Sequence, residues 1–222
     1  MIIAERKPIN EIVAMVRDAE RILVLGCRGC VSVCSAGGER EVELLCSLIR
    51  LGKKQAGQQV QVEGATLVRQ CDKEYVDEID RWQGQYDAIV SMACGVGVNF
   101  IANLRPADKV YPAVNTSFFG GSALQGEWSE QCAGCGDCVL HLTGGLCPVA
   151  RCAKSLMNGP CGGSVDGRCE IHREIPCIWQ AIHDRLSRFE QKAELDRVAP
   201  IRDWRPAGHG GPRKAVRNDL TI

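Results

Sequence analysis

Eight of the fourteen cysteines in this 222-residue chain fall within one segment, between Gln131 and Trp179. The first three have the spacing C-x2-C-x2-C, which puts three thiols on one tight loop, as in loops that bind [4Fe–4S] clusters. Such a cluster needs a fourth, more distant cysteine that is often followed by proline, and Cys147-Pro148 has that form. The segment therefore predicts at least one metal centre. Its cysteines are Cys132, Cys135, Cys138, Cys147, Cys152, Cys161, Cys169 and Cys177.

Eight thiolates are enough for two adjacent centres of four ligands each. We assign the triplet to a [4Fe–4S] cluster that is completed by Cys147 or Cys177. With Cys147 on the cluster, the second centre has the ligands Cys152, Cys161, Cys169 and Cys177. Zinc and iron–sulfur both remain open for it, because thiolate is the soft ligand that suits either. Zinc sites usually draw ligands from short-spaced pairs, which the later cysteines lack.

A disulfide framework is the main alternative for so many cysteines. The chain begins MIIAERKPINEIV, with three charged residues at positions 5–7 and no apolar run typical of a signal peptide. It has no apolar stretch of about 18 residues that could cross a membrane. We therefore expect a cytoplasmic protein with reduced thiols, where cysteine clusters more often bind metals. The 27 basic and 27 acidic residues leave no basic excess for binding nucleic acid.

The first hundred residues alternate between strand and helix patterns, which predicts an α/β fold with a doubly wound parallel sheet of about four strands. Short apolar runs mark the strands, and apolar residues at helical spacing mark the helices. The expected strands are 22–25, 60–68, 86–92 and 109–114. The expected helices are 9–19, one that opens at 37–39, 74–82 and 96–104.

Three cysteines lie just beyond the carboxyl ends of predicted strands: Cys27, Cys71 and Cys94. Those ends line the crevice in which open α/β sheets bind ligands. Cys30 and Cys34 lie in the loop after the first strand, so four of these five cysteines can hold one [4Fe–4S] cluster. We expect Cys30 as the fourth ligand, with Cys34 as its main competitor.

Two other interpretations of the amino-terminal half were weighed. Cys46 lies in mid-helix on the apolar face, where a cysteine behaves as a small hydrophobic residue. We therefore expect Cys46 to have a packing role and no role as a ligand. Dinucleotide binding needs a complete glycine fingerprint. Gly26-Cys27-Arg28-Gly29 lacks the third glycine, and Gly95-Val96-Gly97 is followed by Phe100 where glycine or alanine is required. Nicotinamide binding is therefore not expected.

The domain organisation follows from these patterns. We expect a Rossmann- or flavodoxin-like domain at 1–118, a cysteine-rich domain at 119–195 and an extended tail at 196–222. Small residues predict a linker at 111–126, and a helix should run from Cys177 to about Leu195. The cysteine-rich domain is also rich in glycine and can bury little apolar surface, so it needs a metal to fold. The histidines show no paired ligand spacing; they are His141, His172, His183 and His209.

The cysteine-rich segment closely resembles the zinc- or iron–sulfur-binding C-terminal domain associated with methylenetetrahydrofolate reductases. The resemblance rests on Cys132-Ala-Gly-Cys135-Gly-Asp-Cys138, Thr143-Gly-Gly-Leu-Cys147-Pro148, Asn158-Gly-Pro-Cys161-Gly-Gly163 and Pro176-Cys177-Ile-Trp179. Three amino-terminal runs are similar to the MetV-type small subunit of acetogenic bacteria: Gly26-Cys27-Arg-Gly-Cys30, Gln70-Cys71 and Ala93-Cys94-Gly-Val-Gly97.

That resemblance implies a partner, the MetF-type flavin-containing subunit, a (β/α)8 barrel that reduces 5,10-methylenetetrahydrofolate to 5-methyltetrahydrofolate. It implies that this chain passes electrons to the partner's FMN or FAD and takes them from an upstream donor protein. No catalytic acid, base or nucleophile is expected in this chain. Two alternatives remain: a structural zinc-binding scaffold, and a thiol-based disulfide reductase that uses an exposed, low-pKa Cys27 with Cys30.

Overall fold

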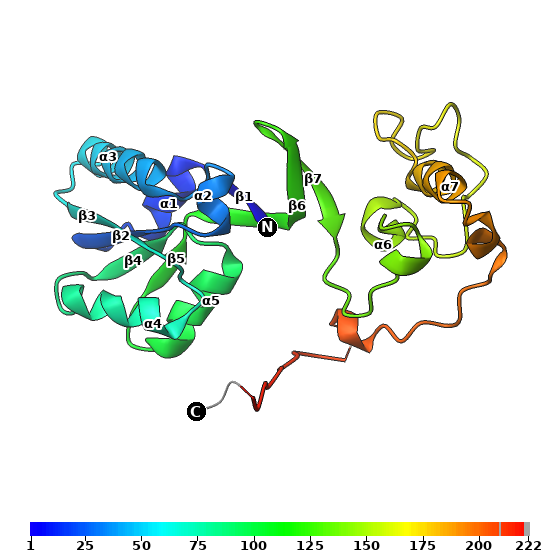
Figure 1. Cartoon of the computed structure of the whole chain (residues 1–222). Helices are drawn as coiled ribbons and strands as arrows, with labels where there is room; N and C mark the ends of the chain where they lie inside the picture. Colours follow the sequence, from blue (N-terminus) through cyan, green and yellow to red (C-terminus); the bar gives the residue numbers. More distant parts are fainter. Residues whose placement is uncertain (209, 220–222) are drawn as a thin grey trace. The chain divides into compact units, whose positions relative to one another are not determined.

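The computed structural model describes residues 1–208 and 210–219. They divide into two compact units. The first comprises Met1–Phe118 and Ser122–Trp128, and the second comprises Phe119–Gly121 and the described residues from Ser129 onward. Figure 1 shows the elements of each unit in sequence colours.

A four-stranded parallel sheet forms the centre of the first unit, in the order β3-β2-β4-β5. The strands are β2 (Arg21–Cys27), β3 (Gln61–Leu67), β4 (Ala88–Ser91) and β5 (Val110–Pro112). Strand β2 pairs in parallel with both neighbours, so that Cys27 is opposite Leu67 and Leu25 is opposite Ser91. The parallel α/β sheet predicted from the sequence is confirmed.

Helices cover both faces of this sheet, which makes it doubly wound (Figure 1). The helices of the first unit are α1 (Ile9–Met15), α2 (Cys30–Val33), α3 (Glu39–Gln55), α4 (Lys73–Val76) and α5 (Gly95–Leu104). Side chains alternate along β2: Ile22 and Val24 pack with α1 and α3, whereas Leu23 and Leu25 pack in a second core with Ile101 of α5. A strand buried on both faces explains the unbroken apolar run in its sequence.

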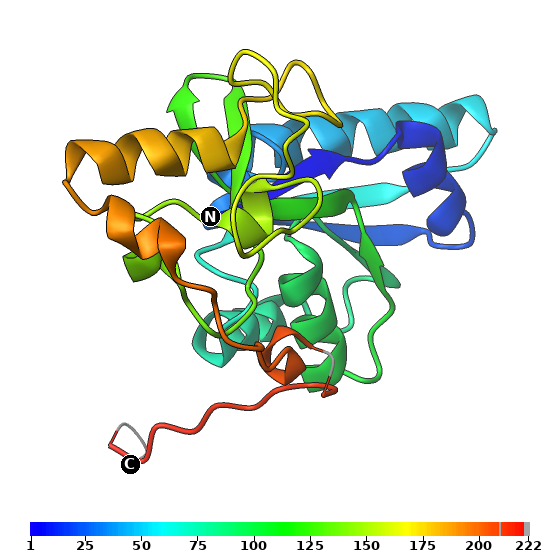
Figure 2. The same ribbon diagram turned by 90° about the vertical axis from the view of Figure 1, so that its right-hand side faces the viewer.

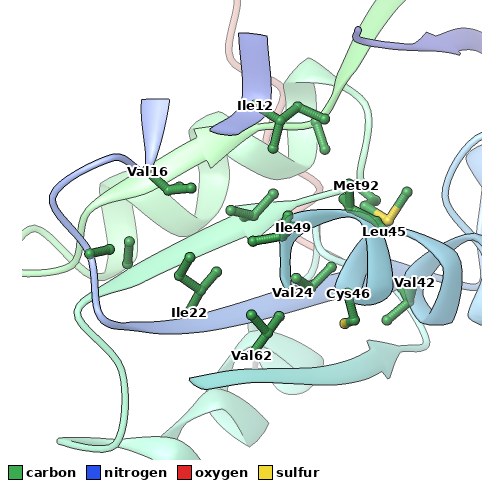
Figure 3. Packing of buried hydrophobic residues seen from close by; sticks show 14 residues of the cluster. Ile12, Val16, Ile22, Val24, Val42, Leu45, Cys46, Ile49, Val62 and Met92 are labelled. Carbon is green, nitrogen blue, oxygen red and sulfur yellow. The ribbon is translucent and has the colours of Figure 1, made fainter. Parts of the chain in front are cut away.

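The core beneath α3 includes Cys46, which is 4% exposed and packs with Val42 and Ile49 (Figure 3). Gly64 of β3 lies under this helix, and a Cβ at Gly64 would come within 2.9 Å of the Cys46 sulfur. Burial raises the pKa of the Cys46 thiol. The interpretation of Cys46 as a packing residue is confirmed.

Several predicted boundaries were too long. The helix expected at 74–82 is α4 followed by a 3-10 helix, Asp77–Trp82. The linker expected at 111–126 is wrong. That stretch contains most of β5 and all of β6 (Val114–Leu124), which joins β1 (Ile2–Arg6) and β7 (Glu127–Cys132) in a three-stranded antiparallel sheet, in the order β1-β6-β7. Asn, Thr, Ser and Gly dominate β6 because most of its residues are exposed, and this pattern imitates a linker.

The second unit has little regular structure. Its helices are α6 (Pro148–Arg151) and α7 (Ile178–Arg188), with short 3-10 turns at Leu140–Leu142, Lys192–Asp196 and Arg205–Ala207. Ile178, Trp179, Ile182 and Leu186 of α7 are buried in a small core against Leu146 and Leu195. The helix expected to reach Leu195 ends at Arg188.

After α7 the chain is mostly irregular through the described residues, as Figure 2 shows in orange and red. His209 and residues 220–222, which belong to the predicted tail, lie outside the described residues. No helix in the described part of the chain is both long and apolar enough to cross a membrane.

Candidate metal centres

All fourteen cysteines lie within the described residues, and all are free thiols. The structure therefore contains none of the disulfides that the alternative framework requires. The cysteines fall into three sets by position: those of the first unit, those of the triplet loop (residues 132–138), and the later ones, from Cys147 to Cys177.

Cys27, Cys71 and Cys94 converge at the carboxyl ends of the parallel strands. Cys27 is the last residue of β2, Cys71 follows the end of β3, and Cys94 follows the end of β4 at the start of α5. Burial of its sulfur raises the pKa of Cys71, and so do the neighbouring thiols of Cys27 and Cys94. Like charges near one another oppose ionisation, which adds to the effect of burial on Cys71.

A buried polar network fixes the backbone beneath these cysteines. The Gln70 side chain is fully buried, and its Nε2 donates to the carbonyls of Leu25 at 2.9 Å and Gly26 at 2.8 Å. The Ser91 hydroxyl donates to Gln70 Oε1 at 2.6 Å and accepts from the Ala93 N–H. One side chain thus connects the ends of β2 and β4 with the loop that carries Cys71.

Cysteine spacing gives no indication that Gln70 belongs to this site, although Gln70 immediately precedes Cys71. Its position at a strand end beside a candidate ligand is the sequence signal that could have found it. Its burial is visible only in the fold.

Cys30 and Cys34 lie at the two ends of α2 and differ in their surroundings. The Cys34 thiol is buried and donates to the carbonyls of Val31 at 3.6 Å and Ala4 at 3.7 Å. Cys30 is half-buried at the first position of α2. Between them and β2, the Gly29 N–H donates to Cys27 Sγ at 3.4 Å. Unlike Cys34, Cys30 does not donate its thiol to a pair of buried carbonyls among the described residues, so it is the better candidate for the fourth ligand.

The triplet loop repeats the local geometry seen at Cys27. The Gly134 N–H donates to Cys132 Sγ at 3.4 Å, in the same Cys-x-Gly-Cys order. Gly134 and Gly136 have φ of 62° and 82°, in the left-handed region that glycine adopts without strain. The cysteines of this loop are half-buried or exposed, so the loop can present them to one centre.

Cys147 precedes α6 and acts as its N-terminal cap. Its sulfur accepts a hydrogen bond from the Ala150 N–H at 3.5 Å, and Pro148 occupies the first helical position. Proline there tolerates the missing N–H, and a sulfur at that end accepts an N–H that otherwise lacks a partner. The Cys-Pro pair therefore orients the Cys147 sulfur.

The four cysteines predicted for the second centre line one small cavity in the second unit. It has a volume of about 20 Å³, and its walls include Cys152, Cys161, Cys169 and Cys177, together with Trp179. A space of this size holds about one water molecule. Four thiolates around it match the ligand set of a structural zinc ion, which coordinates four ligands tetrahedrally.

Charged groups adjoin that cavity. Backbone N–H groups of His172 and Ile171 are the main cause of a lowered pKa at the Cys169 thiol. The Cys161 thiol donates to Glu170 Oε2 at 3.2 Å, and Lys154 Nζ lies 2.6 Å from the same oxygen. The N–H donors and the Lys154 cation favour the thiolate form of Cys169, the form that binds metals.

Within residues 1–208 and 210–219, no three His, Cys, Asp or Glu side chains form a group already arranged to hold a metal ion. The ligand assignments made from the sequence therefore stay predictions. The chemistry of the donors fits metals nonetheless, because free thiols share a strand-end edge or a cavity and receive backbone N–H groups.

Comparison with known proteins supports one part of the chain. Residues 111–205 match the family model described as methylene-tetrahydrofolate reductase C terminal, which includes all eight cysteines of the carboxy-terminal half. No curated protein and no solved structure matches the chain. The resemblance found in the sequence is confirmed for this segment. Residues 111–205 of this chain belong to the methylene-tetrahydrofolate reductase C-terminal family.

Proposed function

We propose that this chain is an electron-transfer subunit of a methylenetetrahydrofolate reductase complex, and that it delivers electrons to the flavin of a MetF-type partner subunit. The position of Cys27, Cys71 and Cys94 at or after the carboxyl ends of three neighbouring parallel strands is the observation that carries the proposal, because a structural zinc domain alone does not need it. A bound [4Fe–4S] cluster supplies storage for one electron, and a flavin accepts one or two.

In the first unit, Cys27, Cys71 and Cys94 are the proposed ligands, with Cys30 as the fourth. Gln70 holds the loop of Cys71 against the ends of β2 and β4, so three ligands reach one edge on a rigid support. The Gly29 N–H donates to the Cys27 sulfur, and such donors stabilise thiolate charge at clusters.

In the second unit, the triplet loop is proposed to hold another [4Fe–4S] cluster, completed by Cys147. The N–H groups of Gly134 and Ala150 donate to the sulfurs of Cys132 and Cys147. Cys177 is less suited to complete it, because it lines the cavity of the other three cysteines.

Zinc is the proposed ion for Cys152, Cys161, Cys169 and Cys177. The cavity that these four cysteines line has a volume of about 20 Å³, which suits a single ion. The site then serves folding, since it joins the glycine-rich loops to α7. We therefore propose the structural zinc-binding role, the scaffold alternative, for this centre alone.

A disulfide reductase that acts alone is disfavoured. It needs an exposed Cys27, and the Cys27 residue is only 7% exposed. A buried thiol cannot readily attack a protein disulfide.

The test is anaerobic purification followed by measurement of iron, zinc and acid-labile sulfide per chain. We expect roughly eight irons and one zinc, for two [4Fe–4S] clusters and one four-cysteine zinc site. Cys71→Ser and Cys135→Ser should each lower the iron to roughly half, each by losing one four-iron cluster. Cys46→Ala is the matched control, a free cysteine buried under α3, and should keep all the iron. A wild-type chain with stoichiometric zinc and no iron would overturn the proposal.

A further inference from the structure

Arg202 makes a contact with the triplet loop that the ligand assignments do not explain. It follows the 3-10 turn Lys192–Asp196, and both it and the loop belong to the second unit. Its Nη2 donates to Cys135 Sγ at 2.9 Å and also to the carbonyl of Asp137. An arginine from the carboxy-terminal segment is thus bonded to the middle cysteine of the triplet.

The arginine side chain is buried and incompletely paired. It is only 7% exposed, and its Nε and Nη1 atoms have no hydrogen-bond partner within the described part of the chain. The nearest carboxylate is that of Asp137, 4.0 Å from Nε, and its side chain is 61% exposed. The ring of Trp204 lies 4.7 Å from the guanidinium carbon. A buried guanidinium stays charged, and the exposed Asp137 carboxylate at 4.0 Å compensates that charge only weakly.

The segment around Arg202 fits closely on the loop. A Cβ at Gly136 would lie 2.6 Å from Pro206, in the turn Arg205–Ala207 that lies beside the loop (Figure 1). Arg213 reaches the same loop, with Nη1 3.3 Å from the Gly134 carbonyl. These contacts hold the segment in place without touching a sulfur, whereas Arg202 touches one.

We propose that Arg202 is a positioning residue that supplies the positive charge for the Cys132–Cys138 centre and raises its reduction potential. This rests on the proposed function, because the triplet supplies further negative charge beside Arg202 when it binds its cluster as thiolates. One-electron reduction by an external reductant adds one negative charge to the centre and breaks no bond. A fixed cation against the Cys135 sulfur favours that added charge. The guanidinium group also suits the loop, because it donates hydrogen bonds to a sulfur and to a carbonyl at the same time.

The test is a redox titration of the full, anaerobically purified chain, followed by electron paramagnetic resonance. The signal that Cys135→Ser removes identifies the triplet centre. Arg202→Gln keeps a hydrogen-bond donor and removes the charge. We expect its one-electron reduction to become about tenfold less favourable, a lowering of the midpoint potential by about 59 mV. Arg202→Lys keeps the charge and should fall between Arg202→Gln and the wild type.

Arg213→Gln is the matched control, because it removes a contact from the same segment to the same loop without removing one to sulfur. It should leave the midpoint potential unchanged. An unchanged potential in Arg202→Gln at full iron content would overturn the proposal, and so would an equal shift in Arg213→Gln.

If Arg202→Gln loses the cluster, the iron content and midpoint potential of Arg202→Lys test the charge role instead. Retained iron with a potential below that of the wild type supports the charge role. Loss of iron in Arg202→Lys as well assigns Arg202 to folding only and refutes the proposal. A wild-type chain without iron instead refutes the proposed function, so the two failures are distinguishable.

Discussion

The two halves of this chain present cysteines on opposite kinds of support. In the first unit, Cys27, Cys71 and Cys94 follow the ends of three parallel strands, and buried Gln70 holds those ends together. In the second unit, the triplet and the later cysteines lie on loops, with one small core around α7. The first support is complete without a metal, whereas the second has little apolar surface to stabilise it.

The local geometry is nevertheless the same in both. Gly29 and Gly134 each donate an N–H at 3.4 Å to the cysteine two residues earlier. A short Cys-x-Gly-Cys motif thus forms this bond on a strand end and on a loop alike. What differs is where the remaining ligands come from, and therefore how much the fold depends on the metal.

Metal removal should produce the largest difference between the two supports. We expect chelation of iron and zinc to unfold residues 129–208 locally, because binding of the metal contributes their folding free energy. Limited proteolysis should then cut within the cysteine-rich loops and leave the parallel sheet of the first unit intact. Equal protection of both units after verified metal loss would contradict the comparison.

Cys135→Ser should abolish the flavin reduction that the upstream donor drives in a reconstituted complex with the partner subunit. Its thiol belongs to the triplet, and serine is a poor ligand for iron. The partner's reaction with an artificial dye should remain intact, which controls for the flavin subunit itself. Normal donor-driven turnover by a variant that has lost this iron would count against electron transfer through the triplet centre.

Gln70→Leu tests the support of the first unit. The change removes the Nε2 bonds to the Leu25 and Gly26 carbonyls and the Oε1 acceptor of the buried Ser91 hydroxyl, which costs about 2 kcal/mol in the free energy of unfolding. Chemical denaturation should show this loss, and iron in the first unit should fall. Gln59→Leu, at an exposed loop position, should change neither. Full stability in Gln70→Leu would show that the network does not support the site.

Cys46→Ala should have the smallest effect. It removes a sulfur from the core beneath α3, which costs about 1 kcal/mol of stability. Iron content should match the wild type, because this thiol faces apolar side chains (Figure 3). Loss of four irons in this variant would place Cys46 in a cluster instead.

The sequence by itself determined the type of sheet, the packing role of Cys46 and the family of residues 111–205. Each rests on a signal carried by neighbouring residues: the apolar run of β2, the helical spacing around Cys46, and the spacing within the cysteine motifs. It also predicted that Cys27, Cys71 and Cys94 meet, because parallel strands end at one edge.

Only the tertiary structure decided which side chains far apart in sequence meet. Gln70 is polar and looks ordinary in sequence, and its burial depends on the ends of β2 and β4, to which its side chain is hydrogen-bonded. Arg202 follows Cys135 by more than sixty residues, and no periodicity links the two. The small polar residues of β6 predict a linker, and they form a strand because β1 and β7 pair with it on either side. Pairing between distant segments is set by the packed fold, which local patterns do not encode.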